Sequence, residues 1–263
     1  MKDVRGIEKT SLYKNTQNSF KAKFSDNTEC EKVSKCEWKV FKDAFLEFTQ
    51  YFCPMCETKL NNHTADIDHY RPKSEYEFLK CCCKNYLLMC ADCNRSHKHT
   101  KFPLATDFVA LNSDTLDGEE ALLINPRYDN IFEYFEIAFI NSKGGKKILI
   151  LQPKLELESL QQDKAKETIE LYGLGDCDKK GTTQNCRINL LNMHYLNFHK
   201  LAQKLDETLA ELDEKYSNDT EKIQEEYEKV FQYELEKCSN DELLKQYGFL
   251  EFIRKGQFVF AVE

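Results

Sequence analysis

The chain lacks any apolar run approaching the roughly 20 residues that cross a bilayer. Its first residues, Met-Lys-Asp-Val-Arg-Gly, lack the apolar stretch of a secretory signal. Internal repeats and low-complexity linkers are also absent from the sequence. The 263 residues are 41% hydrophobic and 31% charged, which is typical of a globular protein with a core of its own. We therefore expect a cytoplasmic protein.

The chain also has no overall positive charge: its formal net charge is −8. This argues against a protein that coats nucleic acid by bulk attraction. The charge is unevenly distributed: residues 1–110 carry 18 Lys and Arg against 15 Asp and Glu, whereas residues 111–263 carry 19 against 30. The distribution favours a local nucleic-acid site in the first part and an acidic tail that contacts protein.

Hydrophobic periodicity predicts a mostly helical α+β protein. Residues 1–28 are predicted to form an arm with at most a short helix, and residues 31–52 a helix. Short extended pieces around Ala65–His69 and Tyr86–Met89 predict two strands, followed by a helix from about Ala91 to His99. Alternating residues and a Gly-Gly pair favour a hairpin within residues 104–145.

The rest of the chain is predicted to be helical over residues 159–172, 185–216 and 221–237, with Gly173 ending the first helix and Asn218 with Glu221 forming a capping box. The last two long helices are interpreted as an antiparallel pair packing on the core, with a partner-binding coiled coil as the alternative. We expect three parts: an N-terminal arm and helix (1–50), a zinc-stapled core with its following hairpin (51–145) and a helical C-terminal region (146–263).

Twelve cysteines in a cytoplasmic chain of this size indicate metal binding more than disulfides. Cys53 with Cys56 and Cys90 with Cys93 form two CxxC pairs, which together supply the four thiolates of a tetrahedral zinc site. The 33 residues between the pairs leave room for a functional insert. The other eight are expected to be buried small hydrophobic residues or bystanders: Cys30, Cys36, Cys81, Cys82, Cys83, Cys177, Cys186 and Cys238.

The insert contains an Asp68-His69 dyad and Asn85, and Asn94 follows the second CxxC pair. Phosphodiester hydrolysis needs a base that activates water and a cation that stabilises the phosphate and the leaving oxyanion. Mg²⁺ or Mn²⁺ suits the oxygen ligands present here. Because neighbouring residues on a strand point to opposite sides, a twist or bulge is needed before Asp68 and His69 can serve one site.

The motif set resembles the His-Asn-His (HNH) endonucleases, which have a ββα-metal fold. The residues that carry this resemblance are Cys53-x-x-Cys56, Asp68-His69, Asn85 and Cys90-x-x-Cys93-Asn94. More narrowly, the chain is similar to the PtuB-type nuclease subunits of Septu and certain retron anti-phage systems. That similarity rests on Asp68-His69-Tyr-Arg-Pro-Lys73, Asn85-Tyr-Leu, Cys90-x-x-Cys93-Asn94, Lys101-Phe-Pro103 and Leu123-Ile-Asn-Pro126 with Asp129.

The resemblance implies a role for each motif residue. His69 would be the general base, Asp68 and Asn94 would bind the catalytic divalent ion, and Asn85 would fix the loop carrying His69 through hydrogen bonds to backbone. Cys53, Cys56, Cys90 and Cys93 would hold structural zinc. Many members have His where this chain has Asn94, and His97, on the same helix, is a possible additional ligand.

Cationic side chains flank the motifs and are predicted to contact the nucleic-acid backbone: Arg71, Lys73, Arg95 and Lys98. The resemblance also implies a partner ATPase of the ABC or SMC type. DNA is the favoured substrate. Two alternatives stay open, an RNA nuclease of the same fold that cuts, for instance, tRNA, and a non-catalytic zinc module that only binds nucleic acid or protein.

Overall fold

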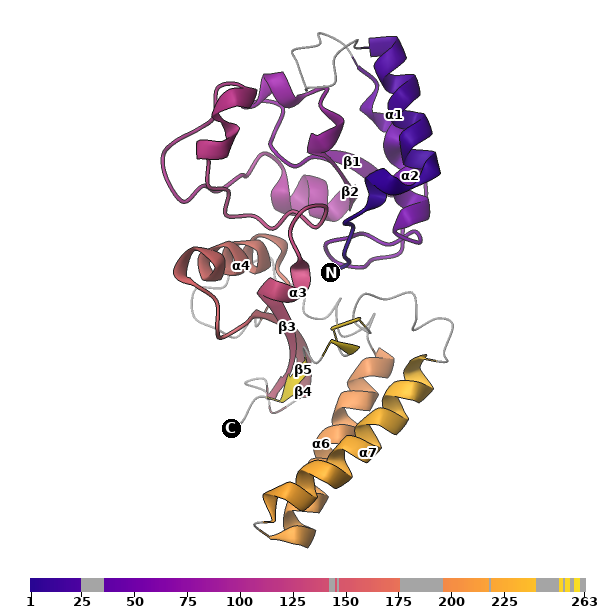
Figure 1. Cartoon of the computed structure of the whole chain (residues 1–263), viewed down its shortest axis with the longest axis vertical. Helices are drawn as coiled ribbons and strands as arrows, with labels where there is room; N and C mark the ends of the chain where they lie inside the picture. The colour runs from indigo at the N-terminus through magenta and orange to yellow at the C-terminus, as the bar shows by residue number, and fades with distance from the viewer. Residues whose placement is uncertain are drawn as a thin grey trace. The chain divides into compact units, whose positions relative to one another are not determined.

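A computed structural model describes residues 1–24, 36–141, 145, 147–175, 196–217, 219–239, 251–252, 254–255 and 258–260. This part of the chain is α+β, mostly helical with two small sheets. It divides into two compact units, Met1–Tyr134 with Pro153–Tyr172, and Phe135–Gln152 with Gly173–Glu263 (Figure 1). Among the residues described, no helix combines the length and apolar content that crossing a membrane takes.

The first unit holds the motif residues. Its longer elements are α1 (Ser11–Phe24), α2 (Lys42–Phe48), β1 (Ala65–His69), β2 (Tyr86–Cys90), α3 (Ile131–Tyr134), α4 (Ser159–Tyr172) and the π-helix η5 (Asp92–Lys98). Short 3₁₀ turns connect them: η1 (Ile7–Lys9), η2 (Trp38–Phe41), η3 (Glu77–Leu79), η4 (Cys83–Asn85) and η6 (Ser113–Gly118).

The two predicted strands are present as an antiparallel pair. Their register runs from Ala65↔Cys90 to His69↔Tyr86. All five residues of β2 are buried, because α2 packs against this strand and η5 follows directly from it. The predicted helix after β2 is also present, over Asp92–Lys98, but in the wider π form.

The N-terminal arm differs from its prediction, because α1 is a helix of 14 residues. Its only buried side chains are those of Tyr13 and Phe20, two turns apart, so its apolar periodicity is weak in sequence. Both rings pack on Phe41, with centroids 5.2 Å away in each case. Aromatic packing of this kind contributes stability beyond its buried area, and here it fixes a helix that its own sequence specifies poorly.

The single helix predicted over residues 31–52 is also shorter than expected. Residues 25–35 lie outside the described part of the chain, and the segment that follows is the 3₁₀ turn η2 continued by α2. The helix ends at Phe48 because Gln50 and Tyr51 both adopt positive φ angles, of 55° and 64°. This left-handed backbone turns the chain into the first CxxC pair.

The second unit contains a sheet of strand order β4-β3-β5 and a pair of long helices. Its elements are β3 (Phe135–Asn141), β4 (Lys147–Pro153), α6 (Leu196–Tyr216), α7 (Thr220–Ser239) and β5 (Phe258–Phe260). The Gly-Gly segment lies between β3 and β4, as the hairpin prediction required, although its first strand begins only at Phe135. β5 pairs with β3 in parallel.

The helices of the C-terminal part agree with their predictions where they are described. α4 matches its predicted range, and Gly173 follows it at a φ of 63°, a conformation that favours glycine. α6 and α7 lie side by side (Figure 1) and are joined by an ion pair between Lys204 and Glu234. Asn218 of the predicted capping box and the predicted helical residues 185–195 are outside the described part.

Arg127 connects the N-terminal helix to the start of β2. The residue is 2% exposed, and its guanidinium donates to the carbonyl oxygens of Cys83 and Tyr86 at 2.8 and 2.7 Å. It also donates to the Tyr13 hydroxyl at 3.0 Å and forms an ion pair with Glu8. One side chain therefore donates to several buried acceptors at once.

Replacing Arg127 with Met should destabilise the protein by about 3 kcal/mol, because buried carbonyl oxygens and Glu8 lose their donor. Urea unfolding followed by circular dichroism measures the change. Arg5→Met is the matched control, since the Arg5–Asp3 pair is solvent-exposed at 39% and 26%, and its loss should change stability by less than about 0.5 kcal/mol. Equal effects of the two substitutions would contradict the role assigned to Arg127.

Candidate functional site

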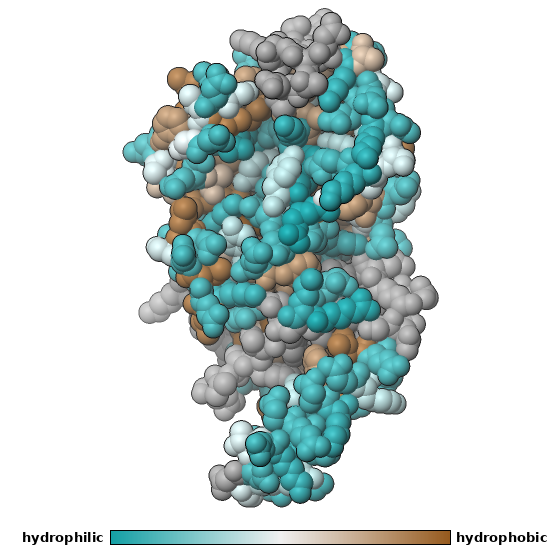
Figure 2. All heavy atoms as spheres, viewed as in Figure 1, coloured by the Kyte–Doolittle hydropathy of each residue, from teal (hydrophilic) through white to brown (hydrophobic). Residues whose placement is uncertain are grey.

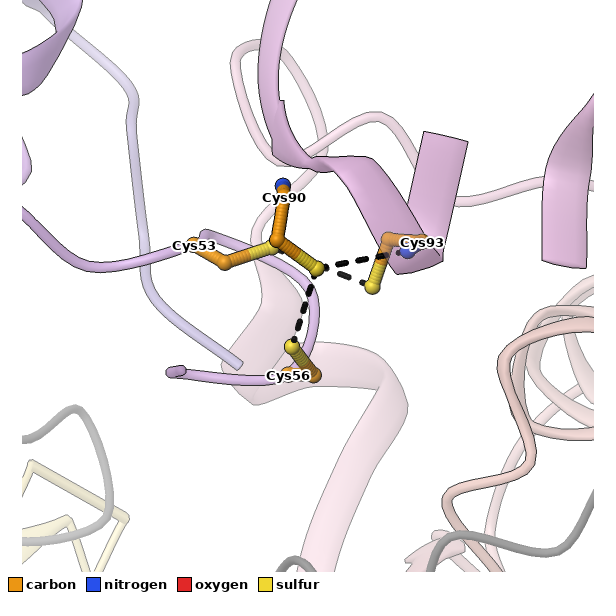
Figure 3. A group of neighbouring side chains, drawn as sticks. All are labelled: Cys53, Cys56, Cys90 and Cys93. Carbon is orange, nitrogen blue, oxygen red and sulfur yellow. Dashed lines mark hydrogen bonds between the residues drawn. The ribbon is translucent and has the colours of Figure 1, made fainter. Parts of the chain in front are cut away.

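The four cysteines of the CxxC pairs form one buried cluster (Figure 3). Their sulfur atoms all lie within 4.8 Å of one another, with 3.8 Å between Cys53 and Cys93 and 3.7 Å between Cys56 and Cys90. A zinc ion with four sulfur ligands at about 2.3 Å gives a tetrahedron with edges of about 3.8 Å. The cluster therefore has the size and the donor set of a structural zinc site.

Backbone geometry places these thiols. The first pair lies in a turn that the Cys53 amide closes by donating to the Thr58 carbonyl at 2.9 Å, with Glu57 at a φ of 57°. The second pair spans the end of β2, at Cys90, and the first turn of η5, at Cys93. Backbone amides of Cys90 and Cys93 donate to the sulfurs of Cys53 and Cys90 at 3.3 and 3.2 Å.

Burial opposes thiolate formation in this cluster when no cation is bound. Burial raises the pKa of the Cys53 and Cys93 thiols well above the ordinary cysteine value. A zinc ion opposes this effect because it binds thiolates and compensates their charge. The four buried sulfurs therefore fit zinc, and the N–H groups that donate to two of them stabilise the thiolate form.

His69 and Asp68 lie on opposite faces of β1. The register continues to His69↔Tyr86, so the bulge considered for this dyad is not formed. The His69 ring packs edge-on between Trp38 and Tyr86, with centroids 5.1 and 5.3 Å away. Its Nε2 atom is 2.8 Å from the Lys80 carbonyl oxygen.

This contact defines the protonation of the His69 ring. A carbonyl oxygen only accepts, so Nε2 carries the proton and the lone pair of the neutral ring is on Nδ1. Burial lowers the pKa of His69 to about 4, which keeps the ring neutral at pH 7. The side chain is almost fully covered, with a residue exposure of 5%.

Asp68 faces η5 on the other side of the strand. Its Oδ2 atom is 2.9 Å from the Lys98 ammonium, which also donates to the His69 carbonyl oxygen at 2.8 Å. Burial raises the pKa of Asp68, and the charge of Lys98 opposes that rise. Asp68 is 8% exposed and Lys98 is fully buried. Lys98, predicted from sequence to contact a nucleic-acid backbone, thus faces the interior in this conformation.

Asp66 is a neighbour of this site that the sequence analysis did not single out. It precedes Asp68 by two residues and therefore lies on the same face of β1. Its carboxylate accepts a hydrogen bond from Asn94 Nδ2 at 3.1 Å and two from Arg95 at 2.9 Å each. The amide nitrogen of Asn94 is thereby bound to Asp66, which directs the amide oxygen away from it. The two-residue spacing was the available signal.

Asn85 fixes the loop that follows β1. The Arg71 amide donates to Asn85 Oδ1 at 2.8 Å, and Asn85 Nδ2 donates to the Arg71 carbonyl at 2.9 Å. The Arg71 side chain donates to Glu119 at 2.7 Å, so its charge is already paired within the protein. A cavity of about 750 Å³ adjoins this clasp, and its lining includes Arg71, Asn85 and Glu119.

The remaining candidate residues contact other groups of the first unit. Lys73 places its ammonium 4.5 Å from the Trp38 ring centroid, and the Arg95 side chain is 69% exposed. The His97 ring meets the Leu171 carbonyl of α4 at 3.2 Å and lies 3.7 Å from Asp92. His97 therefore joins η5 to α4 in this structure.

The cysteines outside the cluster correct one expectation. Cys36 and Cys81, predicted to be bystanders, form a disulfide across 45 residues, and Cys82 is also disulfide-bonded. Their pairing depends on the fold bringing the two α-carbons within 5.7 Å, which spacing in sequence does not reveal. Cys83 is a buried free thiol, whereas Cys30, Cys177 and Cys186 lie outside the described residues.

We expect purified protein to contain about one zinc per chain, measured by elemental analysis. Cys56→Ser or Cys90→Ser should remove the zinc and unfold the first unit, because binding free energy at such a site is folding free energy. Cys83→Ser is the control, since Cys83 is also a buried free thiol but lies outside the cluster. Protein that is well folded and contains no zinc would refute the assignment.

Comparison with known proteins gives one informative match. Over 164 residues, 56% of this chain, the sequence is 29% identical to Septu protein PtuB of Bacillus mycoides (strain KBAB4). The match covers 51% of that protein, so the chain spans about half the length of this curated relative. No family model and no solved structure matches the chain. The narrower resemblance that the motifs indicate is therefore supported by a curated protein: over about half its length, this chain is similar to PtuB.

Proposed function

We propose that this chain is a metal-dependent HNH endonuclease that hydrolyses phosphodiester bonds as an effector of anti-phage defence. DNA is favoured over RNA as its substrate. The defence role rests on the similarity to a Septu protein. The observation that carries the nuclease role is the compact segment from β1 to η5. Two antiparallel strands and a helix, joined by the cysteine cluster, hold a neutral histidine and a buried carboxylate on consecutive residues of β1. Because the two side chains lie on opposite faces of the strand, its end has to twist before both serve one site.

In this proposal His69 is the general base. Its Nδ1 lone pair takes a proton from water as the oxygen attacks phosphorus. The ring then becomes an imidazolium, and the Nε2–H bond to the Lys80 carbonyl becomes stronger because its donor is now charged. The same bond fixes the ring tautomer, and the clasp of Asn85 on Arg71 fixes the loop that leaves the strand.

Asp68 and Asn94 would hold the catalytic Mg²⁺ or Mn²⁺. Asp68 Oδ2 is buried and has no hydrogen bond of good geometry, although the Lys98 ammonium lies close to it. Because Asp66 binds the amide nitrogen of Asn94, the amide oxygen is the atom of this side chain that would act as a ligand. Carboxylate and amide oxygens fit these cations. The ion would stabilise charge on the phosphate and on the leaving oxygen.

The described conformation is a closed one. His69 and Asp68 are 5% and 8% exposed, with Trp38 packed on one and Lys98 on the other. A phosphate can reach both residues only after such a covering side chain moves. Lys73 and Arg95 are exposed and are the proposed first contacts for a nucleic-acid backbone. Arg71 is a further proposed contact, although it is paired with Glu119 in this conformation.

The α6–α7 pair is the proposed contact for a partner ATPase of the ABC or SMC type. Its solvent-facing side chains are mostly charged, and Figure 2 shows this part of the molecule as almost entirely hydrophilic. An acidic surface of this kind repels nucleic acid and fits a basic protein surface. The contact would thus join the partner without competing with the substrate.

The closed site is also the observation that favours the alternative of a non-catalytic zinc module. Incubation of zinc-loaded protein with supercoiled plasmid and with tRNA, each with Mg²⁺, distinguishes the possibilities. Plasmid nicking supports the proposal, cleavage of tRNA alone supports an RNA nuclease, and binding without cleavage of either supports the module.

His69→Ala should reduce strand cleavage by about 10²–10⁴-fold, because the base that activates water is lost. The protein should stay folded and keep its zinc, which elemental analysis checks in the same preparation. His63→Ala is the control, since His63 is an exposed histidine in the same segment, and it should cleave normally. Cleavage by His69→Ala near the wild-type rate would remove His69 from the mechanism.

Substitutions at the proposed ion ligands should change the metal requirement more than the fold. Asp68→Ala should be the most severe, because Asp68 supplies the only negative charge of the proposed Asp68–Asn94 pair and ligand charge governs affinity for a hard cation. Asn94→Asp adds charge and should lower the Mg²⁺ concentration needed, whereas Asn94→His should retain activity. Titration of cleavage with Mg²⁺ and Mn²⁺ measures each effect. An unchanged metal dependence in all three variants would place the ion elsewhere.

A further inference from the structure

Lys98 is the most deeply buried cation of the candidate site, with 1% of its side chain exposed. Lysine is almost never fully buried unless it is paired, because removing its ammonium from water costs several kcal/mol. Here two oxygen atoms hold it, Asp68 Oδ2 at 2.9 Å and the His69 carbonyl at 2.8 Å. These two oxygen atoms therefore form a buried site that already binds a positive charge.

The oxygens that surround Lys98 are of the kind that bind a divalent cation. Asp68 is the proposed carboxylate ligand, and backbone carbonyl oxygens are common ligands of hard cations. Asn94 belongs to η5, four residues before Lys98, and faces the carboxylate of Asp66 on the same face of β1. An ammonium and a metal ion cannot occupy this place together, because their charges would repel at contact distance.

The backbone next to Lys98 has a conformation whose change can move the side chain to solvent. Lys98 is the last residue of η5, which is a π-helix, a form often found at functional sites. The next residue, His99, has a φ of 49° and donates its amide to the Asn94 carbonyl at 2.6 Å. Left-handed backbone at a residue other than glycine is strained, so a change limited to this last turn can release Lys98 toward solvent.

We propose that the Lys98 ammonium occupies the place of the catalytic cation in the metal-free protein and must leave before Mg²⁺ or Mn²⁺ binds. The inference rests on the proposed function for the identity of the ion site. Lys98 then sets the metal concentration at which the site assembles. Once displaced, its side chain is free to meet a backbone phosphate, which reconciles its burial here with the contact expected from the sequence.

The experiment measures Mn²⁺ binding to the full chain without nucleic acid, by electron paramagnetic resonance of the free ion. We expect Lys98→Met to bind Mn²⁺ at least about tenfold more tightly than wild type, because the competing charge is gone. Lys14→Met is the control for loss of one positive charge, since Lys14 is exposed on α1, and it should leave the affinity unchanged. Asp68→Asn should abolish the tight binding in both the wild-type and the Lys98→Met background.

The outcomes separate this inference from the proposed function. Equal or weaker Mn²⁺ binding by folded, zinc-loaded Lys98→Met overturns the inference, while loss of binding in Asp68→Asn still supports the ion site. Binding that Asp68→Asn does not affect places the ion elsewhere and overturns both. If Lys98→Met does not fold, Lys98→Gln replaces it, because its amide still donates to Asp68 without a charge, and unchanged affinity in that variant overturns the inference as well.

Discussion

The cluster of Cys53, Cys56, Cys90 and Cys93 is the constraint on which the candidate site depends. It joins three pieces of backbone: the turn before the insert, the end of β2 and the first turn of η5. β1 and β2 have only five residues each, and an isolated pair of strands this short is marginally stable in water. A metal held by the four thiolates would add binding free energy that such a pair cannot supply from its own hydrogen bonds.

The position of every proposed catalytic group follows from that arrangement. Pairing with β2 fixes the faces of β1, so that Asp68 meets η5 while His69 meets the aromatic residues on the opposite side. The cluster fixes the N-terminal end of η5, and this sets where Asn94 and Lys98 lie on the helix. A charge buried without a partner would be costly, so the closed conformation pairs Asp68 with Lys98 and keeps His69 neutral.

The surroundings of His69 are joined by a disulfide bond. Cys36 lies two residues before Trp38, which packs on the His69 ring, and Cys81 directly follows Lys80, whose carbonyl accepts from that ring. The disulfide between them thus connects the two sides of the His69 pocket through a short path. The Cys36 sulfur also lies 3.8 Å from the Tyr86 hydroxyl, which donates to the same Lys80 carbonyl. The His69 ring is therefore enclosed by a small set of side chains from segments that this disulfide connects.

The sequence by itself determined the features that depend on local spacing. Two CxxC pairs predicted the four-thiol cluster, two short extended segments predicted both strands within one residue of their bounds, and the start of α4 and its end before Gly173 followed from helical periodicity and a C-terminal glycine. Each of these features is specified by residues that are neighbours along the chain or by ligands of one recognisable type. The similarity to a PtuB protein was likewise visible in the motif residues.

Only the tertiary structure decided the contacts between residues far apart in sequence. α1 forms because Tyr13 and Phe20 meet Phe41, and Cys36 meets Cys81 because the fold brings their segments together. The burial of Lys98 could not be predicted either, since a lysine on a short polar helix ordinarily faces water. Its ammonium is inside because β1 presents the Asp68 carboxylate to η5, and that proximity exists only once the strands have paired and the cysteine cluster has fixed the helix beside them.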